Sequence, residues 1–281
     1  MGKHIPAYDN KNEAIININD DTTPLIYFNQ VFLQKGESHQ YQLAEYESAV
    51  VLAGGTCTVT VDGKEFPNIG VRKHVWDGDP AAVYAPVNAV VKVTCTSENA
   101  DIMIAGGRYE ETLEPFEVKP EEADKVQYGS DDTKTHRKIK HILGQKNAPQ
   151  RGRLLVSELF TVGAGGWSGF PAHKHDTERG SNETRYEEVY QFRFNPDQGF
   201  GAQFLYEHED DIGPVYHIKN RSVIAIDKGY HPCVAAPGYE MYYFTIIVGA
   251  HSKSLIQHFD PHHEYQVHTI PGIKDMINKF K

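Results

Sequence analysis

The chain has 281 residues, a length that allows two domains of ordinary size, and its 28 Lys plus Arg against 38 Asp plus Glu give a formal net charge of −10. With 40% apolar and 23% charged residues, and with 16 Tyr and 13 Phe, the composition excludes disorder as the main state. An acidic chain without a block of Lys or Arg also lacks the clustered cations that bind phosphate groups, so we expect neither nucleic acid nor an anionic membrane as a partner.

The start of the chain has no apolar segment and no cleavage site of a secretion signal. The most apolar stretch, residues 241–250, is about half as long as the ~20 residues that a membrane helix needs. Three widely spaced cysteines, Cys57, Cys95 and Cys233, form no CxxC pair, and we expect them to be free, buried thiols. Together these features predict a soluble, cytoplasmic protein.

Short β-strands dominate the predicted elements. Residues 57–64 alternate between apolar and polar side chains, which places Cys57, Val59 and Val61 on one face, and Asp62-Gly63 then favours a tight hairpin. Further strands are predicted at residues 82–85, 90–94, 154–160, 189–194, 203–206, 223–226 and 242–248. Their regular spacing predicts an all-β protein built from sandwich or barrel domains.

The segment between the two halves of the chain is rich in charge. We interpret residues 116–150 as a linker, which leaves an N-terminal domain at residues 1–115 and a C-terminal domain at residues 151–281. A helical tail is predicted at residues 273–280.

The second half carries a pattern typical of a metal site. On an extended strand, His173 and His175 project from the same face because they are two residues apart. Two adjacent carboxylates follow, and we assign Glu188 rather than Glu187 because Glu188 shares its face with the aromatic residues of the strand at 189–194. A third imidazole, His231, lies in a Gly-Tyr-His-Pro turn. An HxH alone is common among 15 His, but this combination predicts a divalent-metal shell.

The order HxH, Glu, His on successive strands resembles the cupin superfamily. Within it, four strings resemble the 5-deoxy-glucuronate isomerase family of bacterial inositol catabolism, which is related to the uronate ketol-isomerases of pectin breakdown. They are Trp-Ser-Gly-Phe-Pro-Ala-His-Lys-His-Asp, Glu-Glu-Val-Tyr-Gln-Phe-Arg-Phe, Gln-Gly-Phe-Gly and Gly-Tyr-His-Pro, between residues 167 and 232. The likeness covers most of the chain and implies a bicupin with two jelly-roll-like β-barrels.

Two departures from the general cupin pattern limit what the resemblance implies. The gap from His175 to Glu188 is longer than is usual in cupins, and the turn before His231 is one residue shorter than the common one; both fit the isomerase family better. In the first half, only His39 stands where an HxH is expected, and Asn88 occupies the place of a ligand His. The N-terminal barrel is therefore expected to be metal-free and structural.

The resemblance implies conversion of 5-deoxy-D-glucuronate, a small sugar acid with an α-hydroxy aldehyde, to 2-deoxy-5-keto-D-gluconate. A metal with two open sites would polarise the aldehyde and acidify the neighbouring C–H bond, and zinc, manganese and iron all stay open as its identity. Tyr190 and Gln203 are predicted to hold substrate oxygens, while Lys174 and Arg185 are predicted partners of the substrate carboxylate. The sequence does not identify the catalytic base.

Three other functions stay open at this point. They are a uronate ketol-isomerase of pectin breakdown, an iron-dependent cupin dioxygenase, and a sugar-acid binding protein with a structural metal. An exposed barrel edge also favours a homo-oligomer.

Overall fold

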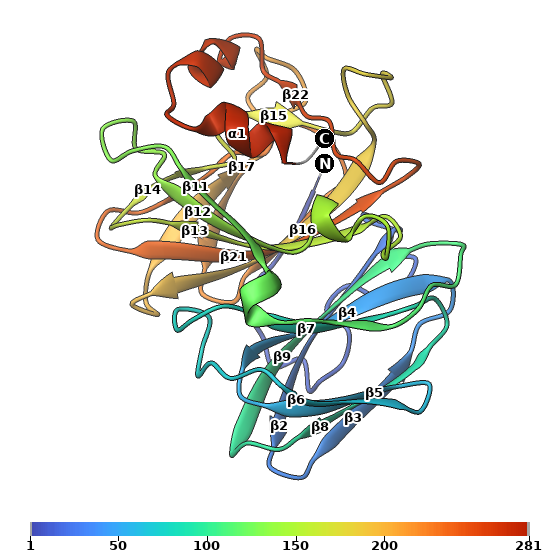
Figure 1. The fold of residues 1–281 in the computed structure, drawn as a ribbon. Coiled ribbons are helices and arrows are strands. Elements are labelled where there is room, and N and C mark those ends of the chain that lie inside the picture. The colour runs from blue at the N-terminus through green and yellow to red at the C-terminus, as the bar shows by residue number, and fades with distance from the viewer. Residues whose placement is uncertain (1, 280–281) are drawn as a thin grey trace. The chain divides into compact units, whose positions relative to one another are not determined.

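Figure 1 shows the computed structural model, which describes residues 2–279. The chain forms two compact units. We call Asp9–Asp124 with Lys140–Val156 the N-terminal unit, and Met1–Tyr8, Lys125–Ile139 and Ser157–Lys281 the C-terminal unit. The fold is all-β, as the sequence predicts, and antiparallel strand pairs build the sheets of both units.

The N-terminal unit contains a five-stranded sheet, β10-β7-β4-β9-β2, and a four-stranded sheet, β3-β8-β5-β6. Apolar side chains from both sheets form one buried core, and the face of Cys57, Val59 and Val61 belongs to it, as predicted. Positive φ angles at Asp62 and Gly63 confirm the predicted hairpin between β5 and β6. The strands are β2 (Ile26–Gln34), β3 (Ser38–Gln42), β4 (Tyr46–Gly54), β5 (Cys57–Val61), β6 (Lys64–Ile69), β7 (Ala81–Ala85), β8 (Val90–Cys95), β9 (Asn99–Arg108) and β10 (Phe116–Val118).

A buried carboxylate fastens residues 152–154 to the N-terminal unit. Glu47 on β4 is fully buried and accepts hydrogen bonds from the backbone N–H groups of Gly152, at 2.7 Å, and Leu154, at 2.8 Å. The hydroxyl of Tyr84 donates a third bond, at 2.7 Å. These contacts explain why a segment near the middle of the chain packs with the first barrel.

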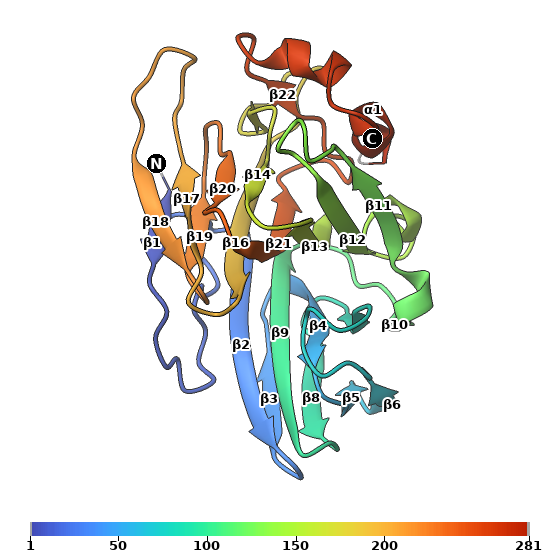
Figure 2. The ribbon, with the colours of Figure 1, turned by 90° about the vertical axis from the view of Figure 1, so that its left-hand side faces the viewer.

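The C-terminal unit is built on the seven-stranded sheet β1-β19-β16-β21-β13-β12-β11, whose strand order can be followed in Figure 2. A four-stranded sheet, β14-β20-β17-β18, and the pair β15-β22 complete it, and both larger sheets contribute to its apolar core. The strands are β1 (Lys3–Ile5), β11 (Asp124–Tyr128), β12 (Arg137–Leu143), β13 (Leu154–Thr161), β14 (Gly166–Ser168), β15 (His173–Lys174), β16 (Tyr186–Asn195), β17 (Phe200–Phe204), β18 (Val215–Lys219), β19 (Val223–Ile226), β20 (Cys233–Ala235), β21 (Glu240–Gly249) and β22 (His258–Phe259).

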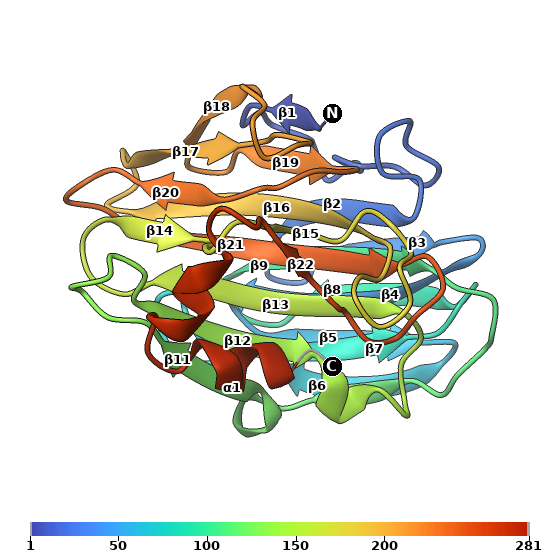
Figure 3. The same ribbon diagram turned by 90° about the horizontal axis from the view of Figure 1, so that it is seen from above.

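Within the described residues, helical structure is confined to short segments: the 3₁₀ turns Pro120–Glu122, Gln145–Asn147 and Glu264–His268, and the helix α1 (Ile273–Asn278). Figure 3 shows α1 lying across β11 and β12, and Ile273 and Met276 of this helix join the core of the C-terminal unit. The helical tail is thus present, although residue 280 lies outside the described residues. No helix within residues 2–279 is long and apolar enough to span a membrane.

The segment expected to be a linker differs from that expectation. Residues 116–150 contain β10, β11, β12 and two 3₁₀ turns, and they are divided between the two units. Within this segment, Arg137–Leu143 forms a strand that is buried at nearly every position, although Arg, Lys and His side chains make up much of it. The three cysteines are free and buried, as predicted.

Candidate metal centre

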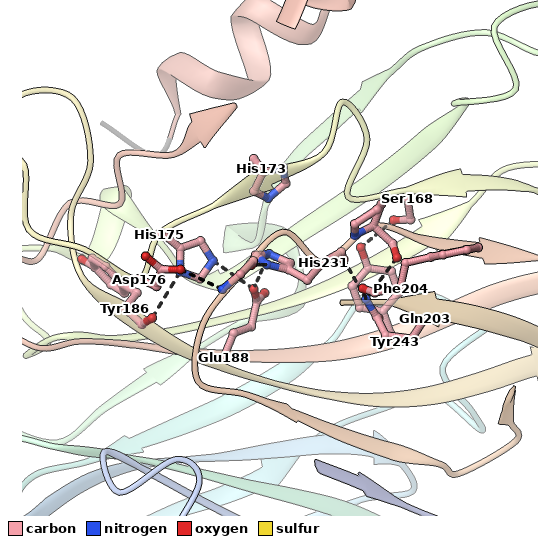
Figure 4. Close-up of polar contacts among 12 residues, drawn as sticks. Ser168, His173, His175, Asp176, Tyr186, Glu188, Gln203, Phe204, His231 and Tyr243 are labelled. Atoms are coloured by element: carbon pink, nitrogen blue, oxygen red, sulfur yellow. Dashed lines mark hydrogen bonds and ion pairs between the residues drawn. The ribbon is translucent and has the colours of Figure 1, made fainter. Parts of the chain in front are cut away.

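Three side chains from distant parts of the C-terminal unit converge in its interior. His175 follows β15, Glu188 lies on β16, and His231 lies in the turn between β19 and β20. One potential ligand atom from each lies within 4.8 Å of the others, and all three residues are buried (Figure 4). The Oε2 atom of Glu188 is 3.1 Å from Nε2 of His175 and 3.2 Å from Nε2 of His231. Glu188, not Glu187, faces the histidines, as alternation along β16 requires.

Backbone carbonyls fix which nitrogen of each imidazole is free to bind a metal. Nδ1 of His231 lies 2.8 Å from the carbonyl oxygen two residues earlier in the chain, and Nδ1 of His173 has the same contact at 3.1 Å. Nδ1 of His175 lies 3.3 Å from the carbonyl oxygen of Tyr186. A carbonyl oxygen only accepts hydrogen bonds, so Nδ1 is the donor in each ring, and Nε2 is left as the ligand atom. Imidazole nitrogens beside a carboxylate form a donor set that suits zinc, manganese or iron.

The protonation of these groups is strongly coupled. Burial raises the pKa of Glu188, but its contacts with His175 and His231 outweigh burial and hold the pKa well below its usual range. Burial lowers the pKa of His175, yet the Glu188 carboxylate reverses this and raises it overall. For His173, burial and the two neighbouring imidazoles act in the same direction and hold its pKa well below 6.5. His173 is therefore neutral at pH 7.

His173, the predicted fourth ligand, lies beside the group of three rather than within it. Its ring centroid is 5.0 Å from that of His231 and 6.3 Å from that of His175. It lines the same cavity as His175 and Glu188, and Figure 4 shows it on the side of the cluster opposite Glu188.

Two polar side chains hold the turn that carries His231. The backbone N–H of Gly229 donates to Asp176 Oδ2 at 2.7 Å, which ties this turn to the residue directly after His175. The amide nitrogen of Gln203 donates to the carbonyl oxygens of His231, at 2.8 Å, and Pro232, at 3.1 Å. Gln203 was expected to contact substrate, but it is fully buried behind the turn and does not line the cavity, so its contacts are those of a positioning residue.

His173, His175 and Glu188 line a narrow cavity inside the C-terminal unit. Its volume is about 40 Å³, enough for a few water molecules. Tyr190, a predicted substrate contact, lines it beside Glu188, and the ring of Tyr243 lies 4.7 Å from that of Tyr190. Burial, followed by the charge of Glu188, raises the pKa of Tyr190 well above 10, so its hydroxyl keeps its proton.

The two cations predicted to bind a substrate carboxylate do not line this cavity. Lys174 lies between His173 and His175 in the chain, so its side chain points to the opposite face from theirs. Its Nζ lies 4.9 Å from the ring centroid of Tyr230 and 3.3 Å from the carbonyl oxygen of Glu207. Arg185 is exposed in the segment that leads into β16.

Sequence reasoning missed a third cation, Arg137 on β12, which does line the cavity. Its guanidinium donates to the hydroxyls of Tyr128, at 2.6 Å, and Tyr243, at 2.7 Å. The sequence offered no clear signal for it, because polar and apolar residues do not alternate regularly in Arg137–Leu143 and the charged segment has the composition of a linker.

Comparisons with known proteins agree with this architecture. The sequence matches the KduI/IolB family over residues 3–266. It is 32% identical over 235 residues to a 5-deoxy-glucuronate isomerase from Geobacillus thermodenitrificans, with 83% of each chain covered. Its structure is similar to that of an IolB-like protein from Salmonella typhimurium, with a TM-score of 0.79, 28% identity and 94% of each chain covered.

A more distant similarity concerns the fold alone. Oxalate decarboxylase from Bacillus subtilis aligns with a TM-score of 0.58 and 10% identity, covering 99% of this chain and 85% of that one. This similarity supports the predicted all-β bicupin architecture. From the match along nearly all of its sequence, the chain belongs to the KduI/IolB family.

Proposed function

We propose that this chain is a 5-deoxy-glucuronate isomerase, an aldose–ketose isomerase that converts 5-deoxy-D-glucuronate to 2-deoxy-5-keto-D-gluconate in inositol catabolism. The observation that carries the proposal is the buried cluster of His175, Glu188 and His231, two of which, His175 and Glu188, line a cavity, in a member of the KduI/IolB family. Curated relatives that bear this enzyme's name, at about 30% identity over most of the chain, support the choice of substrate.

We further propose that His173, His175, Glu188 and His231 hold a divalent metal ion, which is zinc, manganese or iron. Such an ion, when bound, polarises the substrate carbonyl and so acidifies the C–H bond beside it. The chain's own contribution is the fixed set of tautomers. Because each Nδ1 already donates to a backbone carbonyl, Nε2 of each imidazole is the nitrogen left to bind the ion, and no change of tautomer is needed.

The cavity supplies one further group for the reaction. The isomerisation moves a proton between two adjacent carbon atoms and needs no redox cofactor. Tyr190 keeps its proton, so it acts as a hydrogen-bond donor to a substrate oxygen rather than as a base. Because the cavity holds only a few water molecules, the lining side chains must separate to admit a six-carbon acid, which then lies in a site with little water.

The cellular setting is part of the proposal. Three free, buried thiols fit a reducing compartment, which supports a cytoplasmic location. The sugar acid is the proposed small-molecule partner, and a homo-oligomer is proposed from the barrel edge.

Proton NMR in heavy water tests the function directly. Metal-replete protein and a chelated sample are each incubated with 5-deoxy-D-glucuronate. We expect loss of the aldehyde signal and growth of the keto acid in the metal-replete sample alone, with deuterium entering the product if the proton exchanges with solvent. Conversion of the pectin-derived deoxy-hexosulose-uronate instead, or no conversion of either acid, would refute the proposed substrate.

A further inference from the structure

Arg137 is a buried cation without an anionic partner among residues 2–279. Its side chain is 3% exposed on β12. Within the part of the chain that the structure describes, no ion pair joins it to an Asp or Glu side chain. A buried charge is costly unless it is paired, so an unpaired arginine in a protein interior calls for an explanation.

Neutral groups satisfy the guanidinium only in part. The hydroxyls of Tyr128 and Tyr243 each accept one of its five N–H bonds, and its carbon Cζ lies 5.5 Å and 6.0 Å from the centroids of those two rings. The Nε–H group is buried and has no hydrogen-bond partner. The hydroxyl of Tyr243 is itself held by Ser168 at 2.5 Å, so the group is fixed in place. This arrangement keeps donors available in a preset orientation.

Arg137 lines the same cavity as His173, His175 and Glu188. Two aromatic rings connect them: Tyr190 lies beside Glu188, and Tyr243, the partner of Arg137, packs against Tyr190 with ring centroids 4.7 Å apart. A ligand in this cavity would therefore meet the candidate metal ligands at one point and a planar, cationic fork at another. A carboxylate matches such a fork in both charge and geometry.

We propose that Arg137, oriented by the hydroxyls of Tyr128 and Tyr243, is an anion subsite that binds the carboxylate of the sugar acid whose other end reacts at His175, Glu188 and His231. This inference rests on the proposed function for its choice of ligand. It gives to Arg137 the role that the sequence had suggested for Lys174 and Arg185, neither of which reaches the cavity.

The subsite is tested by binding two non-reactive ligands to the metal-replete protein in a calorimeter. The first is the alcohol made by reducing the aldehyde of 5-deoxy-D-glucuronate, which keeps the carboxylate but cannot isomerise. The second is the neutral alditol in which the carboxylate is reduced as well. For Arg137→Met, we expect the affinity for the acid to fall at least about 30-fold and that for the alditol to change less than about 3-fold.

Three companion variants separate binding from folding. Arg137→Lys keeps the charge but loses the fork, so it should weaken acid binding by an intermediate factor. Tyr128→Phe removes one orienting hydroxyl and should also weaken the acid selectively. Arg193→Met is the matched control: Arg193 lies on the opposite face of β16 from Glu188 and stacks on Tyr242, so the acid-to-alditol affinity ratio should stay unchanged. Metal content, measured by elemental analysis, should be the same in all four variants.

Equal losses for acid and alditol would show that Arg137 only supports the fold and would overturn the inference, as would unchanged acid binding in a folded Arg137→Met. If Arg137→Met does not fold, an unchanged acid-to-alditol ratio in both Arg137→Lys and Tyr128→Phe overturns it. The test does not depend on turnover. Failure of the wild-type protein to isomerise 5-deoxy-D-glucuronate would refute the proposed function, while Arg137-independent binding of the acid would refute this subsite alone.

Discussion

Replacing Glu188 by Gln should remove the bound metal, whereas the same change at Glu187 should leave it in place. The carboxylate of Glu188 contacts both imidazoles, with its Oε2 atom 3.1 Å from Nε2 of His175 and 3.2 Å from Nε2 of His231. Glu187 lies on the opposite face of β16. An amide keeps the shape of the carboxylate but lacks its charge. Glu188→Gln and Glu187→Gln therefore make the same chemical change on opposite faces of β16.

The size of the effect follows from the position of Glu188 in direct contact with both imidazoles. Losing a group that only orients a metal ligand already weakens metal affinity about 10- to 100-fold. Loss of a charged ligand should exceed that range, so we expect the dissociation constant to rise more than about 100-fold in Glu188→Gln, or about 2.7 kcal/mol. Isomerase activity should fall in parallel.

The metal-free protein provides a second readout through His175. Burial lowers the pKa of this imidazole and Glu188 reverses that effect, so the pKa is raised in the wild type. Gln at position 188 removes the contribution of the carboxylate and leaves burial opposed only by backbone hydrogen bonds, so the pKa of His175 should fall from its wild-type value. In the wild type, the stabilisation from this raised pKa is present below 6.5 and is lost as pH rises through the raised value. Metal must displace the same proton, so metal affinity should weaken as pH falls below it.

The assay combines elemental analysis of dialysed protein, a metal titration, and NMR titration of the His175 ring after chelation. Circular dichroism of both variants shows whether the fold is kept. The reasoning is refuted if Glu187→Gln loses the metal while Glu188→Gln retains it, because alternation along β16 would then have assigned the wrong face.

Three further predictions concern the support of the fold and the site. Glu47→Gln should lower the free energy of unfolding by about 3 kcal/mol, because an amide cannot accept all three buried hydrogen bonds. The exposed control Glu45→Gln should lower it by less than about 1 kcal/mol, and thermal or urea unfolding compares the two variants. Gln203→Ala removes the amide that donates to the carbonyl oxygens of the His231 turn and should weaken metal binding about 10-fold in a metal titration. Unchanged affinity would show that the turn keeps its conformation without Gln203. Arg185→Met should change KM for the sugar acid less than about 3-fold, since this side chain is exposed and does not line the cavity; a larger rise would return it to the binding site.

Local periodicity accounts for the parts of the structure that the sequence predicts well. Alternation places Cys57, Val59 and Val61 in one core, and the same period of two selects Glu188 over Glu187. The hairpin at Asp62 and Gly63 depends on only two residues and their positive φ angles. Such features are determined by neighbours in the chain, so one sequence is enough to infer them.

Arg137 shows what local periodicity cannot supply. Its partner Tyr243 is 106 residues away along the chain, and they meet only because β11 and β12 add to the edge of a sheet whose central strands come later in the sequence. A charged segment between two runs of strands has the composition of a linker, and nothing in its residues indicates that it completes the second barrel. The same reason explains Lys174 and Arg185, whose closeness in sequence to the histidines suggested that they bind the substrate carboxylate. The side chain of Lys174 points instead toward the ring of Tyr230, and that of Arg185 is exposed.

The distribution of charge in the cavity connects the two proposals. A metal ion at His175, Glu188 and His231 would attract the oxygens of an α-hydroxy aldehyde, but it would attract a carboxylate as well, so the metal alone does not set the orientation of a molecule that carries both. A guanidinium elsewhere in the same cavity gives the carboxylate a separate partner with matched geometry. Because the planar fork prefers the carboxylate, the aldehyde end is left for the metal, and a neutral aldose would lose this selection. Arg137 would therefore contribute to orientation as well as to affinity, and in Arg137→Met the sugar acid should inhibit its own conversion by binding the metal through its carboxylate.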